Sequence, residues 1–279
     1  MPDAANAPPT PNEIAQKLIH RDYLSWSSIS TFLRCPKRFK SQYIDGIEPD
    51  FVSSNLVFGS AIHSAVESVY RALFAGKVSP DVDDLLKVFD SVWKEETRPI
   101  RYGKNESTES LRDLARRMLD AFLASPDHLP DAELIGVEEE LRGAIIDGVP
   151  DILGRVDLIV RTDRAIRLID FKTSKASWSA AKIEESAPQM LLYTKLAAPI
   201  ARSFDLPVEV AWVVLTKHKQ PRIETHCLAP NPDRVGHTCA MVREVWRAMQ
   251  QRYGYAIPSA MNCSTCPFQE TCSAWGEIT

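Results

Sequence analysis

The chain has 279 residues, enough for one large domain or for a core with an added lobe. Its net charge of −4 argues against a general nucleic-acid coat protein, although a local basic groove remains compatible with it. No apolar run approaches the roughly 18 residues of a membrane span, and the stretch MPDAANAPPTPNE has no secretory signal pattern. We therefore expect a cytoplasmic protein that does not associate with membranes.

The first half of the chain is predicted to be helical. The Pro- and Ala-rich residues 1–22 are expected to form a disordered tail. Serines suited to N-capping and apolar residues at helical spacing then predict two short helices with Cys35 at their junction. Further helices are predicted over 56–76, 81–97 and about 106–125.

The middle of the chain changes to short β-branched runs separated by turn residues, which is typical of strands. Three consecutive antiparallel strands are predicted over 132–145, 151–161 and 165–173, and two more over 208–216 and 221–228. Helices are predicted over 188–203 and 231–252. The fold class is thus mixed α/β (α+β).

No internal repeat or long linker is visible, so one compact unit over residues 23–279 is expected. Its predicted parts are a helical part at 23–130, a sheet core at 131–230, and a C-terminal helix with a cysteine-rich segment at 231–279.

The strand containing LIDFKT carries an acid and a lysine two residues apart. Because a strand alternates its faces, Asp170 and Lys172 point the same way. Burying such charges costs free energy unless they are paired or needed for chemistry. The stretch is therefore either a salt-bridged surface edge strand or part of a metal-dependent phosphodiester site.

Asp157 lies on the preceding strand, and the midpoint between Asp157 and Asp170 falls in the polar stretch RTDRA, the natural turn. A hairpin symmetric about that turn places the two carboxylates across from each other. Carboxylates so close repel unless a cation lies between them, and Mg²⁺ is the ordinary cation for an oxygen-rich site.

Six stretches, in order, resemble the PD-(D/E)XK nuclease superfamily in its RecB-like exonuclease branch, which includes AddB-like, exonuclease V-like and CRISPR-associated RecB-like nucleases. They are SWSSISTFLRCPKRF, FGSAIHSAVE, GRVDLIV, LIDFKTSK, QMLLY and the final cysteine cluster, and they span about Leu24 to Trp275. The resemblance implies a restriction-endonuclease-like core, a central mixed sheet flanked by helices, with an N-terminal helical region and a C-terminal iron–sulfur segment.

The resemblance also implies site roles. His63, Asp157, Asp170 and the carbonyl of Phe171 would bind Mg²⁺ or Mn²⁺, and Lys172 would orient or activate the attacking water. Gln189 and Tyr193 match the family's Gln-x-x-x-Tyr element and would face the DNA backbone. Lys37 and Arg38, in a basic run, are also predicted to contact DNA.

Several of these residues keep an alternative interpretation. His63 alone would be a partly buried histidine, and Glu67, one turn later, could pair with it or with an arginine. Gln189 and Tyr193 could be plain helix-surface residues. The run Glu138–Glu140 could offer a second carboxylate, although a solvated strand end is favoured for it.

Clustered cysteines in a cytoplasmic chain indicate a metal site more often than disulfides. Cys263, Cys266 and Cys272 lie close together in the sequence, and Cys35 is the best fourth ligand. The resemblance implies a 4Fe–4S cluster on these four residues, with Zn²⁺ as the alternative. The basic run around Lys37 and Arg38, interleaved with Phe39 and Tyr43, either contacts single-stranded DNA or forms a solvated helix face.

The function predicted is a metal-dependent deoxyribonuclease, an exonuclease acting on single-stranded DNA ends in recombination, repair or DNA processing. No nucleotide-binding P-loop appears, so any helicase or recombination protein that works with it would be a separate chain. The alternatives are a non-catalytic DNA-binding or assembly subunit of a helicase–nuclease complex, and a CRISPR-adaptation nuclease.

Overall fold

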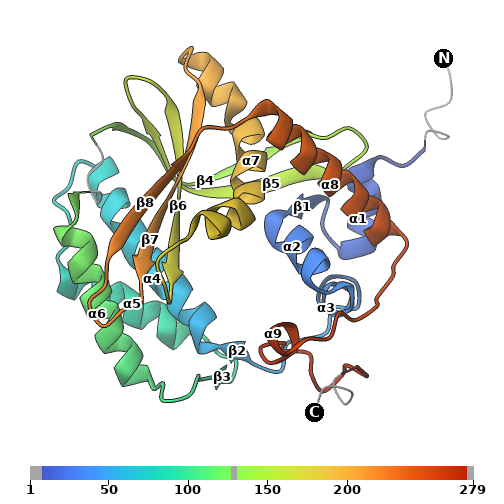
Figure 1. The fold of residues 1–279 in the computed structure, drawn as a ribbon, viewed down its shortest axis with the longest axis horizontal. Helices are drawn as coiled ribbons and strands as arrows, with labels where there is room; N and C mark the ends of the chain where they lie inside the picture. Colours follow the sequence, from blue (N-terminus) through green and yellow to red (C-terminus); the bar gives the residue numbers. More distant parts are fainter. Residues whose placement is uncertain (1–7, 127–130, 275–279) are drawn as a thin grey trace. The chain divides into compact units, whose positions relative to one another are not determined.

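The computed structural model describes residues 8–126 and 131–274 (Figure 1). No helix among these residues has both the length and the apolar character to cross a membrane. The chain divides into two compact units, one of residues 1–50, 141–154 and 236–279, the other of residues 51–140 and 155–235. Each unit is described by itself. The expectation of a single domain over residues 23–279 stays a prediction.

The second unit begins with three helices, α4 (Ser54–Phe74), α5 (Val82–Glu95) and α6 (Thr108–Ala124). Each starts at a side-chain cap, because Ser53, Asp81 and Ser107 each accept a hydrogen bond from a backbone N–H in the first turn. Two short strands, β2 (Val52–Ser53) and β3 (Ile100–Arg101), pair in parallel beside these helices. The three predicted helices are confirmed to within two residues at each end.

The sheet of this unit is mixed. It contains β4 (Glu133–Gly143), β5 (Asp151–Arg161), β6 (Ile166–Ser174), β7 (Val208–Thr216) and β8 (Ile223–Leu228), with the first residues of β5 and the last of β4 belonging to the other unit. β4 pairs with β5, β5 and β6 are antiparallel, β6 and β7 are parallel, and β7 and β8 are antiparallel. β6 therefore lies inside the sheet, so the edge-strand interpretation of LIDFKT is wrong.

Helices cover both faces of this sheet (Figure 1). Alternate residues of β5, β6 and β7 form one hydrophobic core with buried side chains of α4, α5 and α6, including Leu158, Phe171 and Val213. Helix α7 (Ala180–Ser203) packs on β6 and β7 without joining that core. A strand presents its two faces alternately, so α7 covers the face that carries Asp170 and Lys172. The predicted fold, a central mixed sheet flanked by helices, is confirmed.

The first unit joins distant parts of the chain. It contains α1 (Pro11–Ile19), β1 (Tyr23–Ser25), α2 (Trp26–Arg34), α3 (Pro36–Phe39), the π-helix η2 (Lys40–Ile44) and α9 (Ala260–Cys263), with most of α8 (Pro232–Gln250). β1 pairs in parallel with Asp151–Leu153 of β5. Cys35 lies between α2 and α3, as predicted, because it is both the C-cap of the first helix and the N-cap of the second.

The prediction of a disordered tail over residues 1–22 is wrong for residues 11–19, which form α1. Thr10 and Glu13 make a capping box, Pro11 occupies the first helical position, and Leu18 and Ile19 are buried. The Pro- and Ala-rich composition favoured a disordered tail, although the capping box and Pro11 are a helix N-terminal signal. Residues 1–7 of the predicted tail, and Trp275 at the end of the resembling region, lie outside the described residues.

Candidate active site and cysteine site

The predicted hairpin has the predicted register. Leu158 pairs with Ile169 and Arg161 pairs with Ile166, so Asp157 stands across from Asp170. The pairing ends at this point, where the Phe171 N–H donates to Asp157 Oδ2 at 2.7 Å. A carboxylate oxygen thus takes the place of a ladder carbonyl, and both acids lie at the end of the paired region.

Lys172 holds Asp170 directly. Its Nζ donates to Asp170 Oδ1 at 2.7 Å and lies 2.6 Å from Oδ2, which accepts no hydrogen bond from the described residues. Asp170 is only 4% exposed. Burial lowers the pKa of Lys172, but the Asp170 and Asp157 carboxylates outweigh it, and the net pKa is raised. Lys172 is therefore a fixed cation, and both alternatives for this pair, ion pair and phosphodiester site, remain compatible with it.

His63 reaches the same place from the middle of α4. Its Nδ1 lies 3.5 Å from Asp157 Oδ2, and its ring also interacts with the backbone of Phe171. Burial and the neighbouring Lys172 cation lower the pKa of His63, which favours the neutral imidazole that a metal requires. Glu67, one turn further, pairs with Arg71 rather than with His63.

Within this site, Asp157 is the acid whose ionised form is made unfavourable by its surroundings. Burial and the facing Asp170 carboxylate raise its pKa, whereas Lys172 and the Phe171 N–H lower it less. Two buried carboxylates with one lysine between them leave negative charge in excess. That excess is what a bound cation would neutralise.

Glu138 adds a third carboxylate to this end of the sheet. Within β4 it adopts φ +54°, a left-handed conformation that bulges and re-aims a strand residue. Its side chain is only 14% exposed. Burial, Asp157 and Glu67 raise the pKa of Glu138 to about 7.

The solvated strand end that the sequence favoured for Glu138–Glu140 is therefore wrong for Glu138, which is turned inward. It holds for Glu139 and Glu140, which are exposed. The positive φ of Glu138 distinguishes it from Glu139 and Glu140. The sequence does not predict this conformation, because glycine is the residue that usually adopts a positive φ.

The donor set suits a hard divalent cation. An excess of negative charge and an imidazole whose neutral form is favoured are what such an ion would satisfy. Across the described stretches of the chain, however, no three His, Cys, Asp or Glu side chains are gathered in a geometry that would hold a metal ion. Lys172 and the Phe171 N–H occupy the carboxylate oxygens instead.

Gln189 and Tyr193 lie one turn apart on α7. Gln189 Nε2 donates to the Tyr193 hydroxyl at 3.2 Å, and Tyr193 is 5% exposed. Burial raises the pKa of Tyr193, with a further contribution from Asp170. The pair therefore faces Lys172 and Asp170 rather than the open helix surface, so the plain-surface alternative is wrong for Tyr193. Contact of either residue with DNA stays a prediction.

An aromatic patch that the sequence did not indicate lies beside the acids, on the sheet face that carries Asp170. In register, Trp212 stands beside Asp170, and His226 stands beside Trp212. Trp178 packs over both, stacked on His226 with rings 12° from parallel. Its backbone N–H donates to Glu224 at 3.2 Å. Only strand pairing reveals that these residues border the acids.

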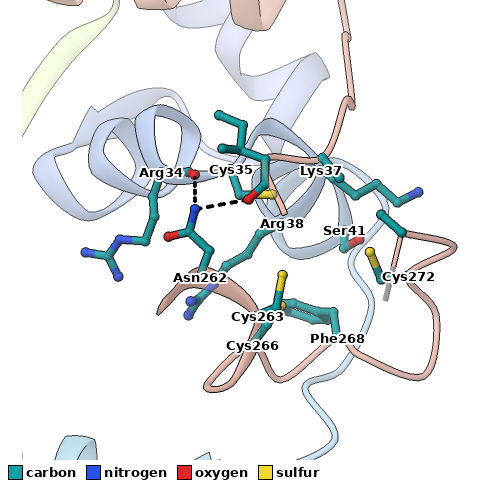
Figure 2. A pocket seen from close by; sticks show the side chains of 13 residues that line it. Arg34, Cys35, Lys37, Arg38, Ser41, Asn262, Cys263, Cys266, Phe268 and Cys272 are labelled. Atoms are coloured by element: carbon teal, nitrogen blue, oxygen red, sulfur yellow. Dashed lines mark hydrogen bonds between the residues drawn. The ribbon is translucent and has the colours of Figure 1, made fainter. Parts of the chain in front are cut away.

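The four predicted cysteine ligands line one cavity of the first unit. Cys35 comes from the α2–α3 junction, and Cys263, Cys266 and Cys272 come from the C-terminal segment (Figure 2). Asn262 ties the two segments together, since its Nδ2 donates to the carbonyls of Arg34 at 3.2 Å and Ile257 at 3.1 Å. The four cysteines that the resemblance grouped thus lie around one cavity, and their role as ligands stays a prediction.

The surroundings of this cavity suit an anionic thiolate centre. Arg38 lies beside Cys266 with a buried Nε that has no partner among the described residues. Burial raises the pKa of the Cys266 thiol, and the Arg38 cation opposes that rise. Four thiols thus line one cavity with a guanidinium beside them, but in the part of the chain that the structure describes no three of them are gathered closely enough to hold a metal ion, so a metal or cluster here stays a prediction.

One smaller expectation in this region, the stacking of Phe39 and Tyr43 on nucleobases, is wrong. Phe39 is fully buried and Tyr43 is 8% exposed, so neither can stack on a nucleobase between the basic residues. Their rings pack against each other in the core, because they lie on the inner side of α3 and η2. Of the two remaining cysteines, Cys227 is exposed on β8 and Cys239 is buried on α8.

The family model of the PD-(D/E)XK nuclease superfamily matches residues 23–273. The chain belongs to this superfamily. No curated protein matches it. Among solved structures it is similar to a candidate exonuclease from Eubacterium rectale, with 11% identity, 96% of this chain and 90% of that chain covered, and a TM-score of 0.56. It is also matched to the protein SSO0001, with 17% identity over 88% of this chain and 96% of that one, at a TM-score of 0.35.

Membership identifies the chain as carrying a nuclease fold, and nucleases of this superfamily generally use divalent metals such as Mg²⁺. The likeness to the Eubacterium rectale structure shows the fold alone at this identity. The residues matched include the hairpin with Asp157, Asp170 and Lys172, the helix with His63, and the four cysteines.

Proposed function

We propose that this protein is a metal-dependent DNA nuclease that hydrolyses phosphodiester bonds from single-stranded ends. The observation that carries the proposal is the convergence of His63, Asp157, Asp170 and Lys172 at one end of a hairpin. A charge set of this kind, with both aspartates largely buried, is costly in free energy unless chemistry requires it. Metal-assisted hydrolysis of a phosphodiester can use such a set.

In this proposal His63, Asp157, Asp170 and the Phe171 carbonyl hold Mg²⁺ or Mn²⁺. When bound, the ion lowers the pKa of water and neutralises charge on the phosphate. Lys172, which pairs with Asp170 in this structure, would direct its ammonium to the attacking water and the phosphate oxygens. Tyr193 and Gln189 fix the position of Lys172 from the α7 side and border the DNA backbone.

The finer assignment is to the RecB-like branch, with a 4Fe–4S cluster on Cys35, Cys263, Cys266 and Cys272 and zinc as the alternative. The four thiols around one cavity and the unpartnered Arg38 Nε support it. Such a centre would join the two ends of the chain, which removes much chain entropy from the unfolded state. Lys37 and Arg38 would contribute positive charge for DNA beside it.

The exonuclease assignment is supported by the likeness to the Eubacterium rectale candidate exonuclease. A non-catalytic DNA-binding subunit of a helicase–nuclease complex is the competing function. The complete set of Asp157, Asp170, Lys172 and His63 disfavours it, because a subunit without activity has no need of the buried charges. The cytoplasmic location, any helicase partner, and a role in repair or CRISPR adaptation stay predictions.

The test uses anaerobically purified protein with single-stranded DNA labelled at either end, in Mg²⁺, Mn²⁺ or EDTA. The Lys172→Ala variant removes the fixed cation, and Lys175→Ala, an exposed lysine three residues later, is the matched control. Stepwise shortening of the DNA that requires metal, is lost in Lys172→Ala and is kept in Lys175→Ala supports the proposal. Intact DNA in every metal, with a folded protein, favours the binding subunit instead.

A further inference from the structure

The segment that follows α8 leaves large apolar side chains in solvent. Tyr253 is 61% exposed and Tyr255 is 60% exposed, and the nearby exposed side chains of the same unit are Ile257, Met261 and Leu33. Single exposed apolar residues are ordinary, but two tyrosines with further apolar neighbours on one short segment indicate a contact surface.

This segment is fixed along the basic helices. The Lys37 N–H donates to the Tyr255 carbonyl at 3.0 Å. Gly254 lies against η2 so closely that a Cβ there would meet the Lys40 side chain at 2.6 Å. Asn262 holds the same segment further along, through its bonds to the carbonyls of Arg34 and Ile257 (Figure 2). The contacts of Tyr255 and Gly254 place the backbone of residues 253–255 beside the α2–η2 stretch.

The charges along this surface are positive. Arg34, Lys37 and Arg252 have no carboxylate partner within the described residues, whereas Lys40 pairs with Asp45 at 2.6 Å. The whole chain carries a net charge of −4, so a local excess of cations marks this face. Exposed aromatic rings among unpaired cations complement a polyanion whose bases are free to stack.

We infer that Tyr253 and Tyr255, with Arg34, Lys37 and Arg252, form a binding surface for single-stranded DNA. The tyrosine rings stack on unpaired bases, and the cations contact the phosphates. This surface replaces Phe39 and Tyr43, which the sequence indicated and which are buried. The inference rests on the proposed function for the identity of its ligand, and it adds a binding site outside the catalytic residues.

The test separates stacking from folding. Binding is measured in the Lys172→Ala background, without added metal, to an oligothymidylate and to an abasic oligomer of the same length. The variants are Tyr253→Ala with Tyr255→Ala, the same pair changed to Phe, and Tyr102→Ala, an exposed tyrosine of the other unit, as control.

The double alanine variant should weaken oligothymidylate binding by about tenfold for each tyrosine, since a stacked base contributes a loss of that order. Binding of the double alanine variant to the abasic oligomer should stay unchanged. The double Phe variant and Tyr102→Ala should bind both oligomers as tightly as the parent protein. Lys37→Gln should reduce the slope of log K for DNA binding against log salt concentration by about 0.7.

Equal losses on both oligomers would overturn the inference, because the tyrosines would then support the structure and not the bases. Unchanged binding of oligothymidylate by the alanine variant, or no DNA binding by the parent, would also overturn it. Binding that follows the prediction in a wild-type protein that cleaves no DNA would sustain this inference and refute the nuclease proposal.

Discussion

Replacing Glu138 by Gln should stabilise the metal-free protein at alkaline pH. Glu138 is only 14% exposed and lies near Asp157 and Glu67, and its 3.7 Å ion pair with the exposed Arg155 offsets this only in part, so its ionised form is unfavourable in the folded state. Gln has the same shape and the same difficulty with φ +54°, so the substitution changes the charge and leaves the backbone strain in place.

The magnitude follows from the pKa. Burial and the neighbouring carboxylates raise the pKa of Glu138 from its ordinary 4.5 to about 7. Each pH unit between those values costs 1.36 kcal/mol, so the ionised folded state loses about 3 kcal/mol. The folded protein binds the proton more tightly than the unfolded one. Stability therefore falls as pH rises from about 4.5 to about 7, and stays low above it.

The assay is denaturant unfolding in EDTA at pH 4.5 and pH 8. Glu138→Gln should match the parent at pH 4.5 and exceed it by about 3 kcal/mol at pH 8, which is about 5 °C in Tm for a chain of this length. Glu140→Gln, on an exposed neighbour, should shift stability by less than about 0.5 kcal/mol. Saturating Mg²⁺ should reduce the advantage of Glu138→Gln, because a cation relieves the same repulsion.

A Glu138→Gln protein that gains nothing between pH 4.5 and pH 8 would refute this reasoning, as would a loss of stability at pH 8. Either result would mean that solvent or the Arg155 ion pair cancels the repulsion from Asp157 and Glu67.

Three further substitutions probe the two sites. Asp157→Asn keeps an oxygen for the Phe171 N–H, so the protein should stay folded by circular dichroism while metal-dependent cleavage falls by at least about 100-fold; retained cleavage would remove Asp157 from the site. Tyr193→Phe removes a hydroxyl near Lys172 and should lower kcat by about tenfold with little change in Tm, and an unchanged kcat would make Tyr193 a packing residue. Cys35→Ala should release bound iron or zinc by elemental analysis and lower stability by several kcal/mol, whereas Cys227→Ala, on an exposed thiol, should do neither. Full metal content in Cys35→Ala would exclude it as a ligand.

The sequence was sufficient wherever the signal was local. The pairing of Asp157 with Asp170 follows from the alternation of two strands and the polar turn midway between them, and both lie within 14 residues. The Cys35 junction follows in the same way from Pro36, which cannot continue α2 and can start α3. The superfamily assignment also rested on motifs of this length, and the family model supports it.

Features that depend on distant parts of the chain required the tertiary structure. Phe39 and Tyr253 are both aromatic residues near lysines or arginines, yet one is fully buried and the other is 61% exposed. Glu138 and Glu140 are neighbours in one acidic run, yet only Glu138 turns toward Asp157. Burial is decided by what packs from elsewhere in the chain, and no window of a few residues contains that information.

The sequence by itself thus determined which chemical groups this protein carries and the strand register that pairs its two aspartates, whereas the family resemblance grouped the distant cysteines. Only the tertiary structure decided that β6 is an interior strand, that Glu138 lies near the two aspartates, and that the two tyrosines after α8 are exposed. The physical reason is that propensity and alternation act between near neighbours, whereas burial and electrostatic fields sum over every segment that folding brings together.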